Sequence, residues 1–181
     1  QWEYKMTNLK YYKMREMVKS PKFGTEGSAC FDICAFLEEG MEITVYRMNN
    51  LKVKVRPEWY DVEHNPKLRF RIAPADRVLI PTGLIFDIPD GHSVRLHTRS
   101  SVSLKKGLTM PNGEGIIDSD YYHQTFVMLY NAGADEVLIE DGERIAQGEL
   151  IKNYDYTIEE TEDVPEQKTS RVGGFGSTGV R

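Results

Sequence analysis

The chain has 181 residues, about the size of one domain, and its 23 Lys and Arg residues against 28 Asp and Glu residues give a net charge of -5. Hydrophobic residues make up 40% and charged residues 28%, which is typical of a globular protein. An acidic chain is a poor candidate for binding nucleic acid through its phosphates, so we expect no direct nucleic-acid binding. No apolar run approaches the roughly 20 residues of a membrane-spanning helix, and residues 1–10 lack the apolar core of a signal peptide.

Two cysteines, Cys30 and Cys34, are too few for a disulfide scaffold. A chain of this length buries enough surface to fold without disulfide or metal cross-links. No histidine or second cysteine pair lies near them at the spacing of a zinc site. The cysteines therefore predict free thiols and a reducing, cytoplasmic compartment.

Short segments in which apolar and polar residues alternate run through most of the chain, and turn residues separate them. The segments 43–46 and 51–56 alternate in this way on either side of Asn49-Asn50, which predicts a β-hairpin. We expect further short strands at 68–72, 78–80, 84–86, 94–96, 125–130 and 137–139. Many short strands at close spacing predict an all-β sandwich or barrel.

One short helix is expected at 100–106, with Ser100 or Ser101 as its N-terminal cap and Gly107 at its C-terminal end. The segment Thr98-Arg99-Ser100-Ser101 combines hydroxyl groups with a guanidinium, a combination suited to binding an anion. Taken alone, a plain serine cap beside an exposed arginine explains this segment as well.

The segment 115–121 (GIIDSDY) follows the turn Pro111-Asn112-Gly113. The alternation of Asp118 and Asp120 predicts two carboxylates on one face of a strand, one of them a candidate general base. Two surface acids near a turn are the alternative interpretation of this segment alone.

The last part of the chain differs in composition from the rest. Residues 159–166 (EETEDVPE) carry five acidic residues and a proline, which predicts a solvated linker, and residues 171–179 hold four glycines around Phe175. A glycine-rich loop can surround phosphates with backbone N–H groups, although such a terminus is more often disordered. We therefore divide the chain into a β domain, 1–158, and a linker with a C-terminal arm, 159–181.

Five segments occur in an order that resembles the five motifs of the trimeric dUTPase family. They are Ser28-Ala29-Cys30-Phe31-Asp32-Ile33, Thr98-Arg99-Ser100-Ser101, Gly115-Ile116-Ile117-Asp118-Ser119-Asp120-Tyr121, Gly142-Glu143-Arg144-Ile145-Ala146-Gln147 and Gly173-Gly174-Phe175-Gly176-Ser177-Thr178-Gly179. The resemblance runs from about residue 9 to residue 180. It implies an all-β jelly-roll or β-clip-like barrel that forms a homotrimer, with one short helix and a flexible C-terminal arm.

The resemblance also implies a function, the hydrolysis of dUTP to dUMP and pyrophosphate with Mg²⁺, which keeps uracil out of DNA and supplies dUMP. Each active site would draw on all three chains of the homotrimer. Asp118 matches the aspartate that positions and deprotonates the attacking water, and Asp32 matches an acid that reaches the metal through water. The implied substrate contacts are Arg99, Ser100, Ser101 and Gln147 for the phosphates, Asn112, Gly115, Ile117 and Tyr121 for uracil and deoxyribose, and Arg171, Phe175, Gly176, Ser177 and Thr178 in the arm.

More residues lie between Asp32 and Pro81 than in the family pattern, so we expect an inserted β-hairpin or lobe within about residues 40–75. Its aromatic and basic residues form either a surface for a protein partner or a solvent-exposed surface without a binding role: Trp59, Tyr60, Lys67, Arg69 and Arg71.

Two other functions stay open on the sequence. The related dCTP deaminase, or a bifunctional deaminase–dUTPase, is similar in fold and also uses an Arg-Ser-Ser run. An ungapped count places its catalytic glutamate at Met128, and a thioether cannot transfer protons, which disfavours deamination. The second alternative is a trimeric interaction or regulatory module that binds a protein through the insert.

Overall fold

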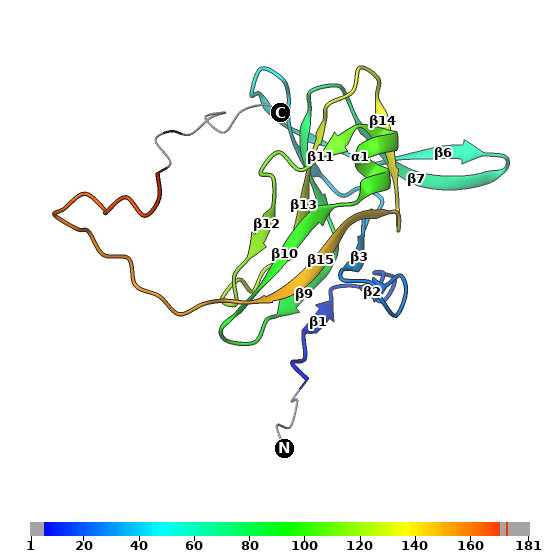
Figure 1. Ribbon diagram of the computed structural model, residues 1–181. Coiled ribbons are helices and arrows are strands. Elements are labelled where there is room, and N and C mark those ends of the chain that lie inside the picture. The colour runs from blue at the N-terminus through cyan, green and yellow to red at the C-terminus, as the bar shows by residue number, and fades with distance from the viewer. Residues whose placement is uncertain (1–5, 171–172, 174–181) are drawn as a thin grey trace.

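The computed structural model describes residues 6–170 and Gly173. These residues form fifteen strands and one short helix (Figure 1). In chain order they are β1 (Lys10–Lys13), β2 (Lys22–Phe23), β3 (Phe31–Cys34), β4 (Ile43–Tyr46), β5 (Lys52–Val55), β6 (Glu58–Val62), β7 (Asn65–Ile72), β8 (Arg77–Pro81), β9 (Leu84–Asp87), β10 (His92–Thr98), α1 (Ser100–Lys106), β11 (Leu108–Thr109), β12 (Gly115–Ile117), β13 (Phe126–Asn131), β14 (Val137–Glu140) and β15 (Arg144–Lys152).

Two five-stranded sheets make up most of the molecule, in the orders β12-β10-β15-β3-β2 and β11-β13-β8-β4-β5. Strands β1 and β9 form a pair, and β14, β7 and β6 form a three-stranded sheet. Every pairing among these strands is antiparallel. The predicted all-β class is confirmed, and the hairpin predicted around Asn49-Asn50 is the β4–β5 hairpin.

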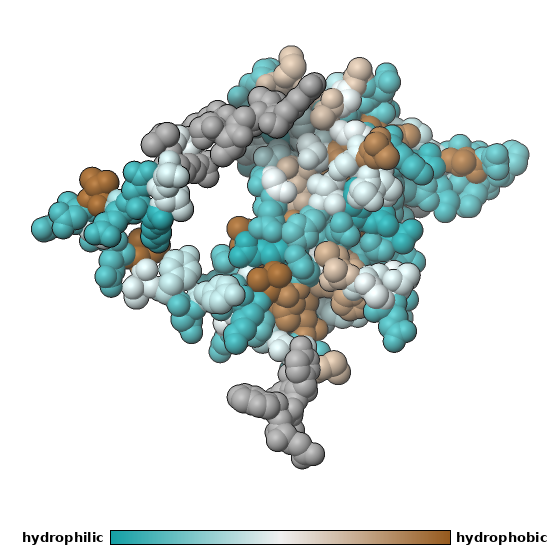
Figure 2. All heavy atoms as spheres, viewed as in Figure 1, coloured by the Kyte–Doolittle hydropathy of each residue, from teal (hydrophilic) through white to brown (hydrophobic). Residues whose placement is uncertain are grey.

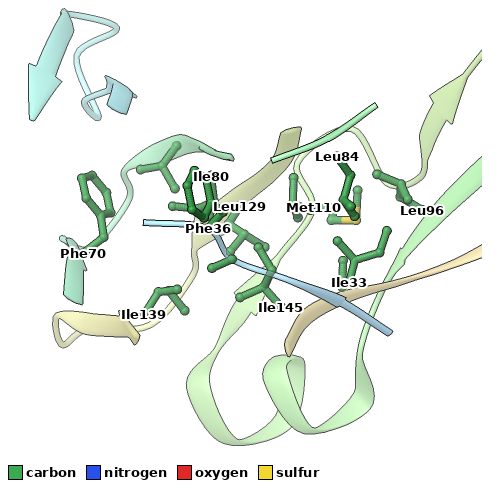
Figure 3. Packing of buried hydrophobic residues seen from close by; sticks show 14 of the residues in the cluster. Ile33, Phe36, Phe70, Ile80, Leu84, Leu96, Met110, Leu129, Ile139 and Ile145 are labelled. Carbon is green, nitrogen blue, oxygen red and sulfur yellow. The ribbon is translucent and has the colours of Figure 1, made fainter. Parts of the chain in front are cut away.

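The core is built from the alternate residues of strands in both large sheets. Ile33 and Ile145, from β3 and β15, and Ile80 and Leu129, from β8 and β13, have no solvent exposure. Figure 3 shows these four side chains gathered with Phe36 and other buried residues. Burying a side chain of this size contributes roughly 1.5–3 kcal/mol. The core therefore holds β10 and β15, which carry the second and fourth motifs, in fixed positions.

Helix α1 spans the predicted residues, and Gly107 ends it as expected. Gly107 adopts the left-handed conformation (φ 63°), and its N–H donates to the carbonyl oxygens of Ser103 and Val102. The predicted serine cap is wrong, because the N-cap residue is Arg99, whose side chain makes no capping hydrogen bond. Ser100 and Ser101 already belong to the helix, and both are exposed. Helix α1 has seven residues and is far too short to span a membrane. No other helix of the described residues is long and apolar enough to do so.

Two hairpins, β4–β5 and β6–β7, occupy the region where an insert was expected. Figure 1 shows β6 and the start of β7 projecting from the body, and Figure 2 shows that the surface of this projection is mostly hydrophilic. Its other end is anchored, because Phe70 and Ile72 are fully buried and Arg69 pairs with Glu140 of β14 at 2.9 Å. The hydrogen bonds from Arg69 lower the pKa of Glu140. The insertion relative to the family pattern stays a prediction.

Beyond β15 the chain leaves the body as an extended segment without regular structure (Figure 1). Four large apolar side chains on this segment are about 80–90% exposed: Tyr154, Tyr156, Ile158 and Val164. The proposed boundary between a β domain and an acidic linker at residue 159 stays a prediction.

Candidate active site

A cavity of about 270 Å³ lies beside the loop that joins β11 to β12. Four of the predicted substrate residues line it: Asn112, Gly115, Ile117 and Tyr121. The sequence analysis missed its apolar wall, which consists of Leu79, Leu96, Met110, Ile116, Phe126 and Met128, together with Thr125. We call this cavity the hairpin pocket.

The loop at the hairpin pocket is a tight turn pressed against β10. Gly113, with φ 74°, donates its N–H to the carbonyl oxygen of Met110 at 2.9 Å. Gly115 pairs with Leu96 across the β12–β10 ladder, and a Cβ atom added to Gly115 would lie 3.0 Å from the Leu96 Cβ. The absence of a side chain at Gly115 therefore allows the loop to close on β10.

Tyr121 stands at the mouth of the hairpin pocket. Its hydroxyl donates to the carbonyl oxygen of Gln124 at 3.0 Å, and its ring packs edge-on against His123 at 5.6 Å between centroids. These two contacts hold the ring in place, although the side chain is 38% exposed.

Asp118 follows β12 directly and is exposed next to the hairpin pocket. The prediction that Asp118 and Asp120 share one face of a strand is wrong. Strand β12 ends at Ile117, and the next residues form a turn in which the Tyr121 N–H donates to the Asp118 carbonyl oxygen at 3.1 Å. The turn directs the two carboxylates independently of strand alternation.

Four polar residues from β3, β15 and the N-cap of α1 meet, and we call them the arginine–aspartate cluster: Asp32, Arg99, Arg144 and Gln147. The Arg99 Nε lies 2.8 Å from one Asp32 carboxylate oxygen, and the Arg144 Nη1 lies 3.1 Å from the other. Gln147 is the strand neighbour of Asp32 and donates from Nε2 to the Thr98 carbonyl oxygen at 3.1 Å. With two cations on one carboxylate, the cluster has a net positive charge and can attract an anion.

Arg144 is a site residue that the sequence analysis did not assign. It belongs to the fourth motif, and its 57% exposed side chain shares Asp32 with Arg99. The sequence pattern that could have indicated Arg144 is a basic residue just after the turn at Gly142. The helix start with Ser100 and Ser101 follows Arg99 directly, so these residues lie beside the cluster.

A single chain does not bring Asp118 and Arg99 together. In the antiparallel ladder Ile117 pairs with Val94, so Asp118 comes opposite Ser93. Arg99 lies six residues beyond Ser93 on nearly straight, extended chain. At roughly 3.3 Å per residue, the two residues are about 20 Å apart along the sheet. The arm residues Arg171, Phe175, Gly176, Ser177 and Thr178 lie outside the described residues.

A family model described as dUTPase matches residues 60–179, more than half of the chain. The chain belongs to the dUTPase family. It is a dUTP diphosphatase, which hydrolyses dUTP to dUMP and pyrophosphate. The family match confirms the function that the order of the five motifs implied.

Curated relatives of this dUTPase are named deoxyuridine 5'-triphosphate nucleotidohydrolase. The protein from Bartonella bacilliformis is 35% identical over 173 residues, which cover 89% of this chain and 82% of that protein. The protein from Brucella melitensis is 45% identical over 110 residues, which cover 60% of this chain and 69% of that protein.

Solved dUTPase structures share the fold. A dUTPase from Streptococcus mutans matches with a TM-score of 0.61 and 24% identity, covering 83% of this chain and 99% of that one. A mutant dUTPase of Staphylococcus bacteriophage 80alpha with dUpNHpp matches with a TM-score of 0.71 and 19% identity, covering 97% of this chain and all of that one. At these identities the likeness supports the architecture alone.

Met128 and the two cysteines show that this dUTPase has neither a deaminase glutamate nor a reactive thiol at these positions. Met128, where the deaminase comparison places a glutamate, lines the hairpin pocket with a thioether and supplies no acid. Burial raises the pKa of Cys34, and the nearby Asp32 carboxylate raises it further. Burial also raises the pKa of Cys30. Both cysteines are free thiols, and the raised pKa values disfavour a thiolate nucleophile at either position.

Proposed function

We propose that this dUTPase acts as a homotrimer in which Asp118 of one copy activates a water that attacks the α-phosphorus of dUTP. The single observation that carries the proposal is the position of Asp118, exposed at the end of β12 beside a pocket of the size of a nucleoside. A general base must lie within hydrogen-bond reach of the proton that it takes, and an exposed carboxylate at the pocket edge can meet this condition.

The hairpin pocket is the proposed site for uracil and deoxyribose. Asn112 and the backbone of residues 115–117 would hydrogen-bond the uracil edge, and Tyr121 would lie against the deoxyribose and exclude a 2′-hydroxyl. Cytosine would leave buried polar groups of the loop unpaired, at a cost of roughly 1–3 kcal/mol for each group. The tight turn at Gly113 would leave little space beside the base for the methyl group of thymine.

The arginine–aspartate cluster is the proposed site for the phosphates. Arg99 and Gln147 would contact phosphate oxygens, together with Ser100 and Ser101 at the start of α1. Asp32 fixes the guanidinium of Arg99 at 2.8 Å, so the cation is oriented before the nucleotide binds. In the arm, Phe175 would stack on uracil, a contact worth roughly 1–3 kcal/mol, and Arg171, Gly176, Ser177 and Thr178 would contact the outer phosphates.

Two observations support a site shared between copies. The backbone separation of about 20 Å between Asp118 and Arg99 within one chain favours contributions from different copies to one triphosphate. Strands β4 and β13 also carry exposed apolar side chains: Tyr46 is 37% exposed beside a hollow that Leu79 and Met128 line, and Phe126 is 40% exposed. A second copy of the chain would bury these side chains.

Magnesium is the proposed cofactor. A solved dUTPase from phage phi11 is described as coordinating a structural Mg(II) ion. Both carboxylate oxygens of Asp32 are engaged by arginines, and the described residues contain no cluster of three or more acidic, histidine or cysteine side chains. This donor set fits an ion held mainly by phosphate oxygens and water, with Asp32 reaching it through water. When bound, the ion would neutralise part of the triphosphate charge.

An assay of nucleotide preference tests the proposed function. We expect pyrophosphate release from dUTP that depends on Mg²⁺, with a kcat/KM about a hundredfold lower for dCTP, dTTP and UTP, because dCTP leaves polar groups unpaired, dTTP adds a methyl group and UTP adds a 2′-hydroxyl. Release of ammonia from dCTP would support the deaminase instead. A folded trimer with neither activity would support the interaction module, whose surface would be the β6–β7 hairpin with its exposed Trp59.

A further inference from the structure

We propose that Glu114 is a positioning residue for uracil recognition, because its carboxylate ties the loop of the hairpin pocket to β10. Glu114 lies between Asn112 and Gly115, which both line the pocket, and it has no part in the contacts described above. The inference rests on the proposed role of the hairpin pocket in binding the base.

Backbone pairing holds the two ends of the loop, through β11 on β13 and β12 on β10, but residues 110–114 lie outside both ladders. Strand β12 is three residues long and lies at the edge of its sheet, so β10 is its sheet neighbour on one side only. An edge strand of this length gains little from its backbone ladder. The position of Asn112 therefore depends on the backbone hydrogen bonds of the turn and on side-chain contacts near it.

Glu114 supplies such contacts with both of its carboxylate oxygens. The Arg95 Nη1 donates to one oxygen at 3.0 Å, and the His97 Nδ1 lies 3.8 Å from the other. Arg95 and His97 flank Leu96 on β10, and strand alternation places their side chains on the face opposite to that of Leu96. The loop is thus held on two sides of β10, by the contact of Gly115 with Leu96 and by the contact of Glu114 with Arg95.

The partners of Glu114 are themselves fixed. Arg95 also donates from Nε to the Ser93 hydroxyl at 3.1 Å, and that hydroxyl donates to Asn153 at 2.9 Å. The Nε2 of His97 lies 2.9 Å from a Glu149 carboxylate oxygen. Arg95 and His97 are about a quarter to a third exposed and Glu114 is 42% exposed, so water screens the contact in part. The network joins the loop to β10 and β15, the strands that carry the second and fourth motifs.

The test compares Glu114→Ala and Glu114→Gln with the wild-type enzyme. We expect Glu114→Ala to weaken the binding of a non-hydrolysable dUTP analogue about tenfold, on the scale of a lost hydrogen bond to a charged group. We expect kcat to change less than about threefold and the preference for dUTP over dCTP to fall about tenfold. Glu114→Gln keeps an acceptor for Arg95, so its affinity for the analogue and its preference for dUTP should lie between those of the wild-type enzyme and Glu114→Ala. A role in stability alone would lower the melting temperature without changing the preference.

Two further variants make the test decisive. The matched control is Glu42→Ala, which removes an exposed ion pair with Arg56 on the β4–β5 side. It should leave the affinity for the analogue, kcat and the preference for dUTP over dCTP unchanged. Arg95→Gln combined with Glu114→Gln should be no worse than the more impaired single variant, because both changes break the same contact. If wild-type enzyme binds the analogue and the Glu114 variants bind and discriminate equally well, the inference is wrong. If wild-type enzyme itself fails to bind the analogue, the proposed function fails instead.

Discussion

Replacing Asp118 by asparagine is expected to lower kcat for dUTP by about 10²- to 10⁴-fold, the usual contribution of a general base. The amide is the same size as the carboxylate but cannot accept a proton from water. Asp118 is exposed, and its backbone closes the turn to Tyr121, which the substitution leaves intact. The affinity for a non-hydrolysable dUTP analogue should therefore stay within about threefold of the wild-type value.

Asp120→Asn is the matched control for this experiment. Asp120 lies in the same turn, is equally exposed and has no assigned role. It should keep a kcat close to that of the wild-type enzyme. Rapid-quench measurement of one turnover would separate the chemical step from product release. Near-normal turnover in Asp118→Asn would refute the assignment of Asp118 as the base.

The second large effect is expected for Arg99→Gln, which should lower kcat/KM about a hundredfold. A charge-assisted hydrogen bond contributes roughly 1.5–3 kcal/mol, and Arg99 is the less exposed of the two arginines on Asp32, at 21%. Its removal also leaves Asp32 with one cation in place of two, which turns the cluster from net positive to neutral. Steady-state kinetics with dUTP and Mg²⁺ would measure the loss.

Two other arginine variants calibrate this result. Arg144→Gln should cost less, because Arg144 is 57% exposed and screened by water. Arg56→Gln, which breaks an exposed pair on the β4–β5 side, should have no effect on kcat/KM. An Arg99→Gln enzyme with unchanged kcat/KM would remove the arginine–aspartate cluster from the phosphate site.

Local patterns predicted most of the secondary structure. The β4–β5 hairpin and the end of β7 show alternation, β8 and β9 show short apolar runs between turn residues, and α1 is followed by a glycine that ends it. Strand β15 was not foreseen, although it is the longest strand of the described chain. Its buried positions include Ala146 and Gly148, which carry no strong apolar signal, and the ring of Phe31 fills the space above Gly148.

The sequence alone predicted only some of the residues of the candidate site. The resemblance to the five family motifs implied site roles for Asp118, Arg99 and Gln147, and these roles stay predictions. The contact of Arg144 with Asp32 and that of Arg95 with Glu114 depend on which strands become neighbours. Strand order between segments far apart in the chain is a property of the folded sheet, and no local pattern encodes it.

The most direct test of a shared active site is to mix the two inactive enzymes. Asp118→Asn and Arg99→Gln chains, each with a different affinity tag, would be unfolded and refolded together, and trimers that carry both tags would be purified and assayed. If Asp118 and Arg99 of different copies serve one nucleotide, every trimer that carries both tags has one site in three with both residues intact, so roughly a third of wild-type activity should return. If the mixed trimers form and remain as inactive as either parent, Asp118 and Arg99 serve the nucleotide from the same chain, and the shared site is contradicted.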